Sequence, residues 1–148
     1  MEGTFIELRL EVYAPPEKIW NVLTAGEWAE ALFPGCRVES AWRRGAAVVW
    51  RERNGPPFAK GIVVHRTETE LRVVYYDDPD SGSLTDFVEN YEVHPRKNVC
   101  DLCLTVGPWD GAEDRLEWAS ETWEAAALKI KKIAEKKAPQ KSRPPGSG

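Results

Sequence analysis

Residues 110–137 read DGAEDRLEWASETWEAAALKIKKIAEKK, and this stretch decides the fold. At 3.6 residues per turn, one face of a helix collects apolar side chains, namely Leu116, Ala119, Trp123, Ala126, Ile130 and Ile133. The opposite face collects charged side chains, namely Glu117, Glu121, Glu124, Lys131, Lys132 and Glu135. An isolated helix cannot bury such a stripe, so it must pack on a broad partner. We therefore predict that a β-sheet formed by the upstream residues wraps around this helix.

The chain begins with a strand pattern followed by helix signals. Residues 4–13 alternate apolar and polar side chains, which is typical of a half-buried strand. Pro15, Pro16 and Glu17 then favour the start of a helix, because proline and glutamate suit the first helical turn. A second short helix is predicted over residues 27–33.

Six further strands are predicted between these helices and the C-terminal helix. They cover residues 36–43, 46–53, 58–67, 71–77, 84–94 and 99–106, and Gly107-Pro108 is expected to end the last one. Their connections are short, so consecutive strands should pair antiparallel. The order β-α-α-β6-α predicts an α+β fold with a curved antiparallel sheet of about seven strands wrapped around the C-terminal helix.

Composition indicates one ordinary globular domain. The 148 residues are 42% hydrophobic and 30% charged, and we assign residues 1–137 to a single domain. Residues 138–148 are rich in proline, glycine and serine, which predicts a disordered tail. The net charge of −4 argues against binding to nucleic acid, and no apolar run is long enough to insert into a membrane. The N-terminal residues show no signal-peptide pattern, and three cysteines, an odd number, do not indicate a disulfide framework. The chain is therefore expected to be cytoplasmic.

Several segments resemble a known superfamily. They are VYAPPEKIWNVLT at residues 12–24, FPG at 33–35, WRRG at 42–45, and Trp123 in the last helix. With these residues in this order, the chain resembles the START-like (SRPBCC, birch-pollen-allergen-like) superfamily, which has the helix-grip fold. Within it the chain is most similar to the family of the activator of heat-shock-protein-ninety ATPase. The resemblance implies a cavity between sheet and helix, which in some members binds hydrophobic molecules and in others supports cyclisation or dehydration; other members are partners of a chaperone.

The strand pattern predicts which side chains face this cavity. Alternation places Phe87, Glu89 and Tyr91 on one face of their strand, and Trp50 shares a face with Val48. A glutamate on an apolar face must be paired or have a raised pKa. We predict that the ligand-binding residues are Trp50, His65, Tyr75, Phe87, Glu89, Tyr91 and Trp123. Because Ala119 and Ala126 flank Trp123, we expect this part of the helix to leave room for the cavity.

Other chemistry finds little support in the sequence. Cys100 and Cys103 lie three residues apart in a strand, so their side chains should diverge rather than form a redox pair or a metal site. No metal or cofactor motif and no nucleophile motif is present, so no cofactor is expected. The remaining candidates for a general acid or base are Glu89 and His65. Either face of the strand that carries His65 could be the inner one.

Three functional hypotheses follow. The first is binding of a hydrophobic or amphipathic small molecule in an aromatic-lined cavity. The second is a cyclase or dehydratase that uses Glu89 or His65. The third is a module that binds a protein partner such as a chaperone, which requires an exposed apolar patch.

Overall fold

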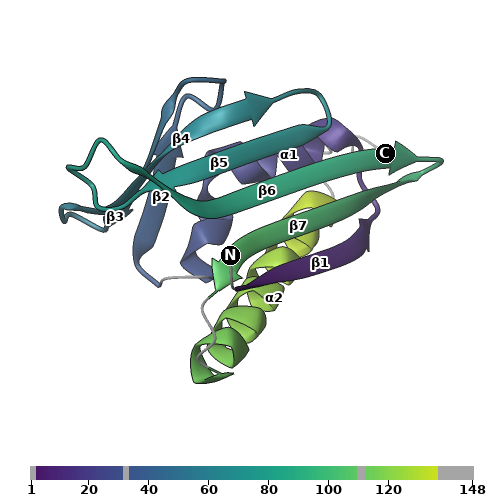
Figure 1. The fold of residues 1–148 in the computed structure, drawn as a ribbon. Coiled ribbons are helices and arrows are strands. Elements are labelled where there is room, and N and C mark those ends of the chain that lie inside the picture. Colours follow the sequence, from purple (N-terminus) through teal and green to yellow (C-terminus); the bar gives the residue numbers. More distant parts are fainter. Residues whose placement is uncertain (1–2, 32–33, 110–112, 137–148) are drawn as a thin grey trace.

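The computed structural model describes residues 3–31, 34–109 and 113–136. Figure 1 shows a seven-stranded sheet that curls around a long helix. The elements in chain order are β1 (Thr4–Val12), α1 (Pro16–Ala25), the 3₁₀ helix η1 (Glu27–Ala31), β2 (Cys36–Ser40), β3 (Ala47–Glu52), β4 (Pro57–Arg66), β5 (Glu70–Tyr76), β6 (Leu84–Arg96), β7 (Val99–Trp109) and α2 (Glu113–Glu135). The tail predicted at residues 138–148 and parts of the predicted segments 27–33 and 110–137 lie outside the described residues.

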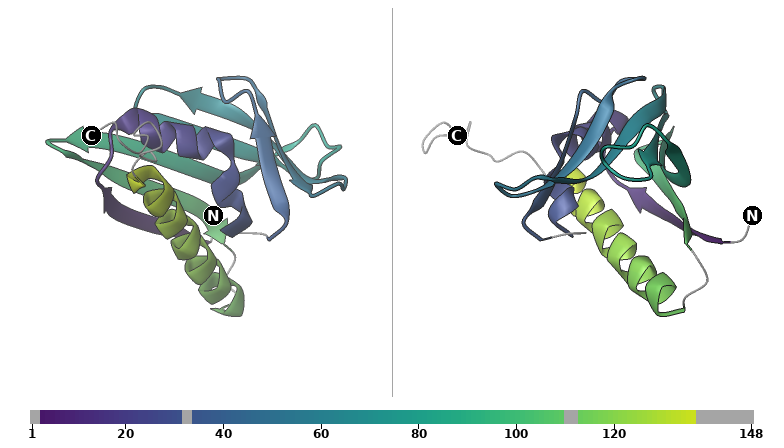
Figure 2. Two further views of the ribbon diagram at one scale, coloured as in Figure 1. Left: turned by 180° about the vertical axis from the view of Figure 1, so that it is seen from behind. Right: turned by 60° about the vertical axis from the view of Figure 1, so that its left-hand side comes forward.

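All strand pairs in the sheet are antiparallel. The spatial order is β1-β7-β6-β5-β4-β3-β2, so β2 to β7 form a meander and β1 joins its far side, next to β7. β1 and β2 are therefore the two edges of the sheet. Figure 2 shows α1 and α2 on the concave side of the sheet. The predicted α+β helix-grip architecture is confirmed.

The apolar stripe of α2 packs against β1, α1 and η1. Ala119, Ala126 and Ile130 are completely buried, and Trp123 is nearly so. We expected the alanines to leave space for a cavity, and this was wrong. They are part of the core, because a small side chain lets the helix approach its neighbours closely.

Strand β7 is longer than the sequence predicts. We expected Gly107-Pro108 to end the sheet, but β7 continues to Trp109, which pairs with Thr4 of β1. Gly107 has a φ of 151°, and a Cβ atom there would lie 3.1 Å from the Cα atom of Phe5. Glycine thus lets the two strands stay together through this irregularity, and the extension places the Trp109 ring beside α2.

No helix in the described ranges is long and apolar enough to cross a membrane.

Candidate ligand-binding site

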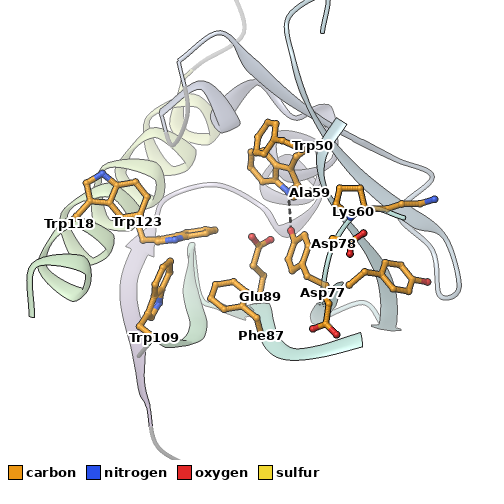
Figure 3. Close-up of a pocket in the computed structure, with 14 residues that line it drawn as sticks. Trp50, Ala59, Lys60, Asp77, Asp78, Phe87, Glu89, Trp109, Trp118 and Trp123 are labelled. Carbon is orange, nitrogen blue, oxygen red and sulfur yellow. Dashed lines mark hydrogen bonds between the residues drawn. The ribbon is translucent and has the colours of Figure 1, made fainter. Parts of the chain in front are cut away.

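A pocket of about 500 Å³ opens between the sheet and the first half of α2 (Figure 3). Strands β3 to β7 supply most of its wall, and α2 supplies Trp118 and Trp123. The residues that line it are Trp50, Phe58, Ala59, Lys60, Tyr75, Tyr76, Asp77, Asp78, Pro79, Phe87, Glu89, Trp109, Trp118 and Trp123. A pocket of this size with mainly apolar walls is typical of a small-molecule site.

Aromatic rings form a continuous wall along one side of the pocket. The ring centroids of Phe87 and Trp109 lie 5.1 Å apart, with the rings edge to face, and the ring centroids of Tyr75 and Phe87 lie 6.1 Å apart. Trp109 in turn contacts Trp118 of α2, with ring centroids 6.4 Å apart. Trp118 is 47% exposed and Phe58 is 40% exposed, so these two rings lie at the mouth. The mouth thus offers apolar surface to solvent, and the interior is enclosed by rings.

Trp28 of η1 fills the core behind the pocket. The centroid of its ring lies 6.1 Å from that of Trp50, 5.9 Å from that of Tyr91 and 6.2 Å from that of Trp123. The indole Nε1–H donates a hydrogen bond of 3.1 Å to the carbonyl oxygen of Leu23, at the end of α1. Trp28 therefore packs against Trp50 and Trp123 on the side away from the pocket and supports these two lining residues.

Glu89 brings a buried carboxyl group to this aromatic surface. It is 6% exposed, and the Tyr91 hydroxyl donates a 3.2 Å hydrogen bond to its Oε1 atom. The Trp50 Nε1–H donates to the Tyr75 hydroxyl at 2.9 Å, and this hydroxyl in turn hydrogen-bonds to Glu89. Burial raises the pKa of Glu89 to about 7, although the hydrogen bonds from Tyr75 and Tyr91 oppose the increase. Glu89 can therefore gain or lose a proton near neutral pH.

Gly61 of β4 allows the Tyr75 ring to occupy its position. The two residues are opposite each other in the β4–β5 ladder. A Cβ atom at residue 61 would lie 2.6 Å from the Val74 carbonyl oxygen and 3.0 Å from the Tyr75 ring. Both distances are too short, so a larger residue must displace the strand or the ring.

We therefore expect Gly61→Ala to lower the free energy of unfolding by about 1–3 kcal/mol and to disturb the bond between Trp50 and Tyr75. Urea unfolding of the variant measures the loss. Gly82→Ala is the matched control, because a Cβ atom there has open space around it. Equal stability of the two variants would contradict the tight contact at residue 61.

The structure gathers most of the predicted site residues at this pocket. Trp50, Tyr75, Phe87, Glu89 and Trp123 all line it. Tyr91 is buried and does not line the pocket, but its hydroxyl group donates a hydrogen bond to Glu89, which does. Whether any of them binds a ligand stays a prediction.

His65 does not lie at the pocket, contrary to its inclusion among the predicted site residues. The ladder between β4 and β5 is irregular between Val63 and His65, so strict alternation fails there. The His65 side chain is 47% exposed, and its Nε2 atom lies 3.1 Å from Glu70 Oε1. This bulge turns His65 outward although Val63 is buried.

Sequence reasoning missed four aromatic residues of the lining, namely Phe58, Tyr76, Trp109 and Trp118. Trp109 was overlooked because Gly107-Pro108 was read as the end of the strand. Trp118 lies off the main apolar stripe of α2, and Phe58 lies near the start of β4. A large aromatic residue beside an otherwise charged helix face was the available signal for Trp118.

The cysteines lie on opposite sides of β7, as predicted. Cys100 is buried, whereas Cys103 is half-buried and pairs across the sheet with Arg9 and Glu92. Within the described ranges, no cluster of three or more His, Cys, Asp or Glu residues is arranged to hold a metal ion.

Comparison with known families now identifies the chain. The family described as "Activator of Hsp90 ATPase homolog 1-like protein" matches residues 13–135, which is most of the sequence. The chain belongs to this family. Its membership confirms the resemblance to the START-like superfamily. A search of curated proteins finds no significant match.

Several solved structures share this fold. The Aha1 dimer from Colwellia psychrerythraea, solved in solution, has a TM-score of 0.70 and 17% identity, with 89% of this chain and 96% of that chain covered. A Cytophaga hutchinsonii protein has a TM-score of 0.68 and 23% identity, with 91% and 97% covered. DynU16, from the dynemicin biosynthetic locus, has a TM-score of 0.66 and 13% identity, with 88% of this chain but 47% of that chain covered. These likenesses establish the fold, and a fold does not by itself determine function.

Proposed function

We propose that the protein binds a hydrophobic or amphipathic small molecule in the pocket between the sheet and α2. The observation that carries the proposal is an aromatic-walled pocket of about 500 Å³ with one buried carboxyl group, Glu89, on its surface. The apolar body of the ligand lies along Phe87, Trp109 and Trp123 and is stabilised by removal of apolar area from water. Glu89 fixes the orientation of the ligand through a polar contact.

A panel of amphipathic small molecules tests this function. Several tryptophans line the pocket, so a ligand is expected to change tryptophan fluorescence and to raise the melting temperature. Both signals must saturate together with ligand concentration. A broad panel without a single saturating ligand would contradict the proposal.

Trp118→Ala and Leu128→Ala separate pocket binding from adsorption to exposed apolar surface. Both residues lie on α2 and are about equally exposed, but only Trp118 lines the pocket. Trp118→Ala is expected to weaken binding about fivefold, because it removes an aromatic contact of about 1 kcal/mol. Leu128→Ala is expected to leave affinity unchanged. Isothermal titration calorimetry with the best ligand of the panel measures both, and equal weakening in the two variants would argue for nonspecific adsorption.

A second candidate function is a cyclase or dehydratase, and one observation favours it. Glu89 lines the pocket and has a pKa of about 7, which suits general acid or base catalysis at neutral pH. His65, the other acid–base group in the hypothesis, is removed from consideration by its exposed position. In this case Glu89→Gln would abolish turnover of a bound substrate while leaving its affinity within a fewfold of the original.

The chaperone-partner hypothesis stays a prediction. The exposed rings Phe58 and Trp118 are part of the pocket mouth, so their exposure supports ligand entry as readily as a protein contact.

A further inference from the structure

The charged groups that line the pocket are mainly acidic. Glu89 lies inside it, and Asp77 and Asp78 lie at its exposed end, just after β5. Lys60 of β4 is the lining residue with a positive charge. In Figure 3 the Lys60 amino group points away from Glu89, so it does not neutralise the buried carboxyl group. The described lining thus combines an excess of negative charge with aromatic rings.

The rings around Glu89 present surfaces that attract positive charge. In Figure 3 the carboxyl group points into the space between Trp50, Phe87 and Trp123. The face of an aromatic ring is the negative part of its quadrupole, and a cation within about 6 Å of the ring centre is stabilised. A carboxylate among such rings matches a group that is positively charged and has apolar substituents.

We propose that the occupant of the pocket is an amphipathic cation, an alkyl- or aryl-substituted ammonium compound whose charged head lies beside Glu89. This inference rests on the proposed binding function and names the class of ligand. The ammonium group lies between Glu89 and the rings of Trp50 and Trp123, and the apolar body extends along Phe87 and Trp109 towards the mouth. Asp77 and Asp78 at the exposed end favour the approach of a cation over that of an anion.

The protonation of Glu89 couples this binding to pH. The ionisable groups that face it are Tyr75 on β5 and Tyr91 on β6, and the pocket also contains Lys60, Asp77 and Asp78. The lining residues that the structure describes on α2 are Trp118 and Trp123, which carry no charge. A cation binds the carboxylate, so binding releases the proton of Glu89 to solvent. With a pKa of about 7 for this group, affinity for a permanent cation rises between about pH 6 and pH 8. An uncharged ligand that accepts a hydrogen bond from the carboxylic acid would show the opposite trend.

Three probes of matched shape test the charge preference. They are trimethyl(4-phenylbutyl)ammonium, the isostere in which carbon replaces the nitrogen, and 6-phenylhexanoate as the anion. Affinities are measured by tryptophan fluorescence at about pH 6, 7 and 8, for the wild type and for Glu89→Gln. We expect the ammonium compound to bind at least about tenfold more tightly than its uncharged isostere at pH 8. In Glu89→Gln both this preference and the rise of affinity with pH should be lost.

Each other outcome has a defined meaning. If the isostere or the anion binds as tightly as the cation, the inference is wrong and the pocket remains a binding site for apolar molecules. If the preference for the cation persists in Glu89→Gln, its assigned origin is wrong. If none of the probes binds, the inference is wrong, and the broader panel then decides the proposed function separately. Circular dichroism of Glu89→Gln establishes that the variant is folded before its affinities are compared.

Discussion

Trp28→Ala is expected to lower the free energy of unfolding by about 3–5 kcal/mol. Trp28 is 2% exposed, and its ring packs against Trp50, Tyr91 and Trp123. Truncation leaves a cavity at the centre of the core, because the three surrounding rings are held by their own strands and helix. Chemical denaturation monitored by far-ultraviolet circular dichroism measures the loss.

Trp118→Ala is the control for this experiment. Trp118 is a tryptophan of the same chain that is 47% exposed, so its removal should cost much less stability than the removal of Trp28. A loss below about 1 kcal/mol for Trp28→Ala would mean that the ring is not a central part of the core.

Glu89→Gln is expected to change how stability depends on pH. The pKa of Glu89 is about 7 in the folded protein, above its ordinary value of 4.5, so the folded state holds the proton more tightly than the unfolded state. Its contribution to stability is therefore complete below pH 4.5 and is lost as the pH rises through 7. The loss amounts to about 3 kcal/mol. Glutamine cannot ionise, so the variant does not show this loss.

The difference in unfolding free energy between Glu89→Gln and wild type isolates this effect. Other carboxylates titrate equally in both proteins and cancel, and the variant should become relatively more stable as the pH increases from 4.5 to above 7. Glu7→Gln, the same substitution at an exposed position of β1, provides the matched control for replacing a carboxyl group that is not buried. A pH-independent difference for Glu89→Gln would mean that the Glu89 carboxyl group is not significantly desolvated.

The architecture was readable from sequence because its signals are local and repeated. Alternation along residues 84–94 predicted that Phe87, Glu89 and Tyr91 share the inner face, and β6 confirms this arrangement. The apolar stripe of α2 likewise predicted the side on which the helix is buried. Each of these patterns extends over several turns or strand positions, so one irregular residue cannot conceal it.

The remaining parts of the site depend on irregularities that sequence patterns do not reveal. A single bulge turns His65 outward, and the continuation of β7 through Gly107-Pro108 brings Trp109 to the pocket. The role of Trp28 depends on η1, whose five residues are too few to show a period. In each case the position of a side chain is decided by contacts between distant segments, such as that between β1 and the end of β7.

The open sheet also bears on how this protein avoids aggregation. Its two edges, β1 and β2, each present unpaired backbone groups that another chain could extend by adding a strand. The edge strand β1 carries Glu7, Arg9 and Glu11 at alternate positions, and β2 carries Arg37 and Glu39. An incoming strand would have to place its side chains among these charges and remove them from water. The fold can therefore keep an open sheet, with the pocket accessible at one end, without its edges promoting assembly into β-rich aggregates.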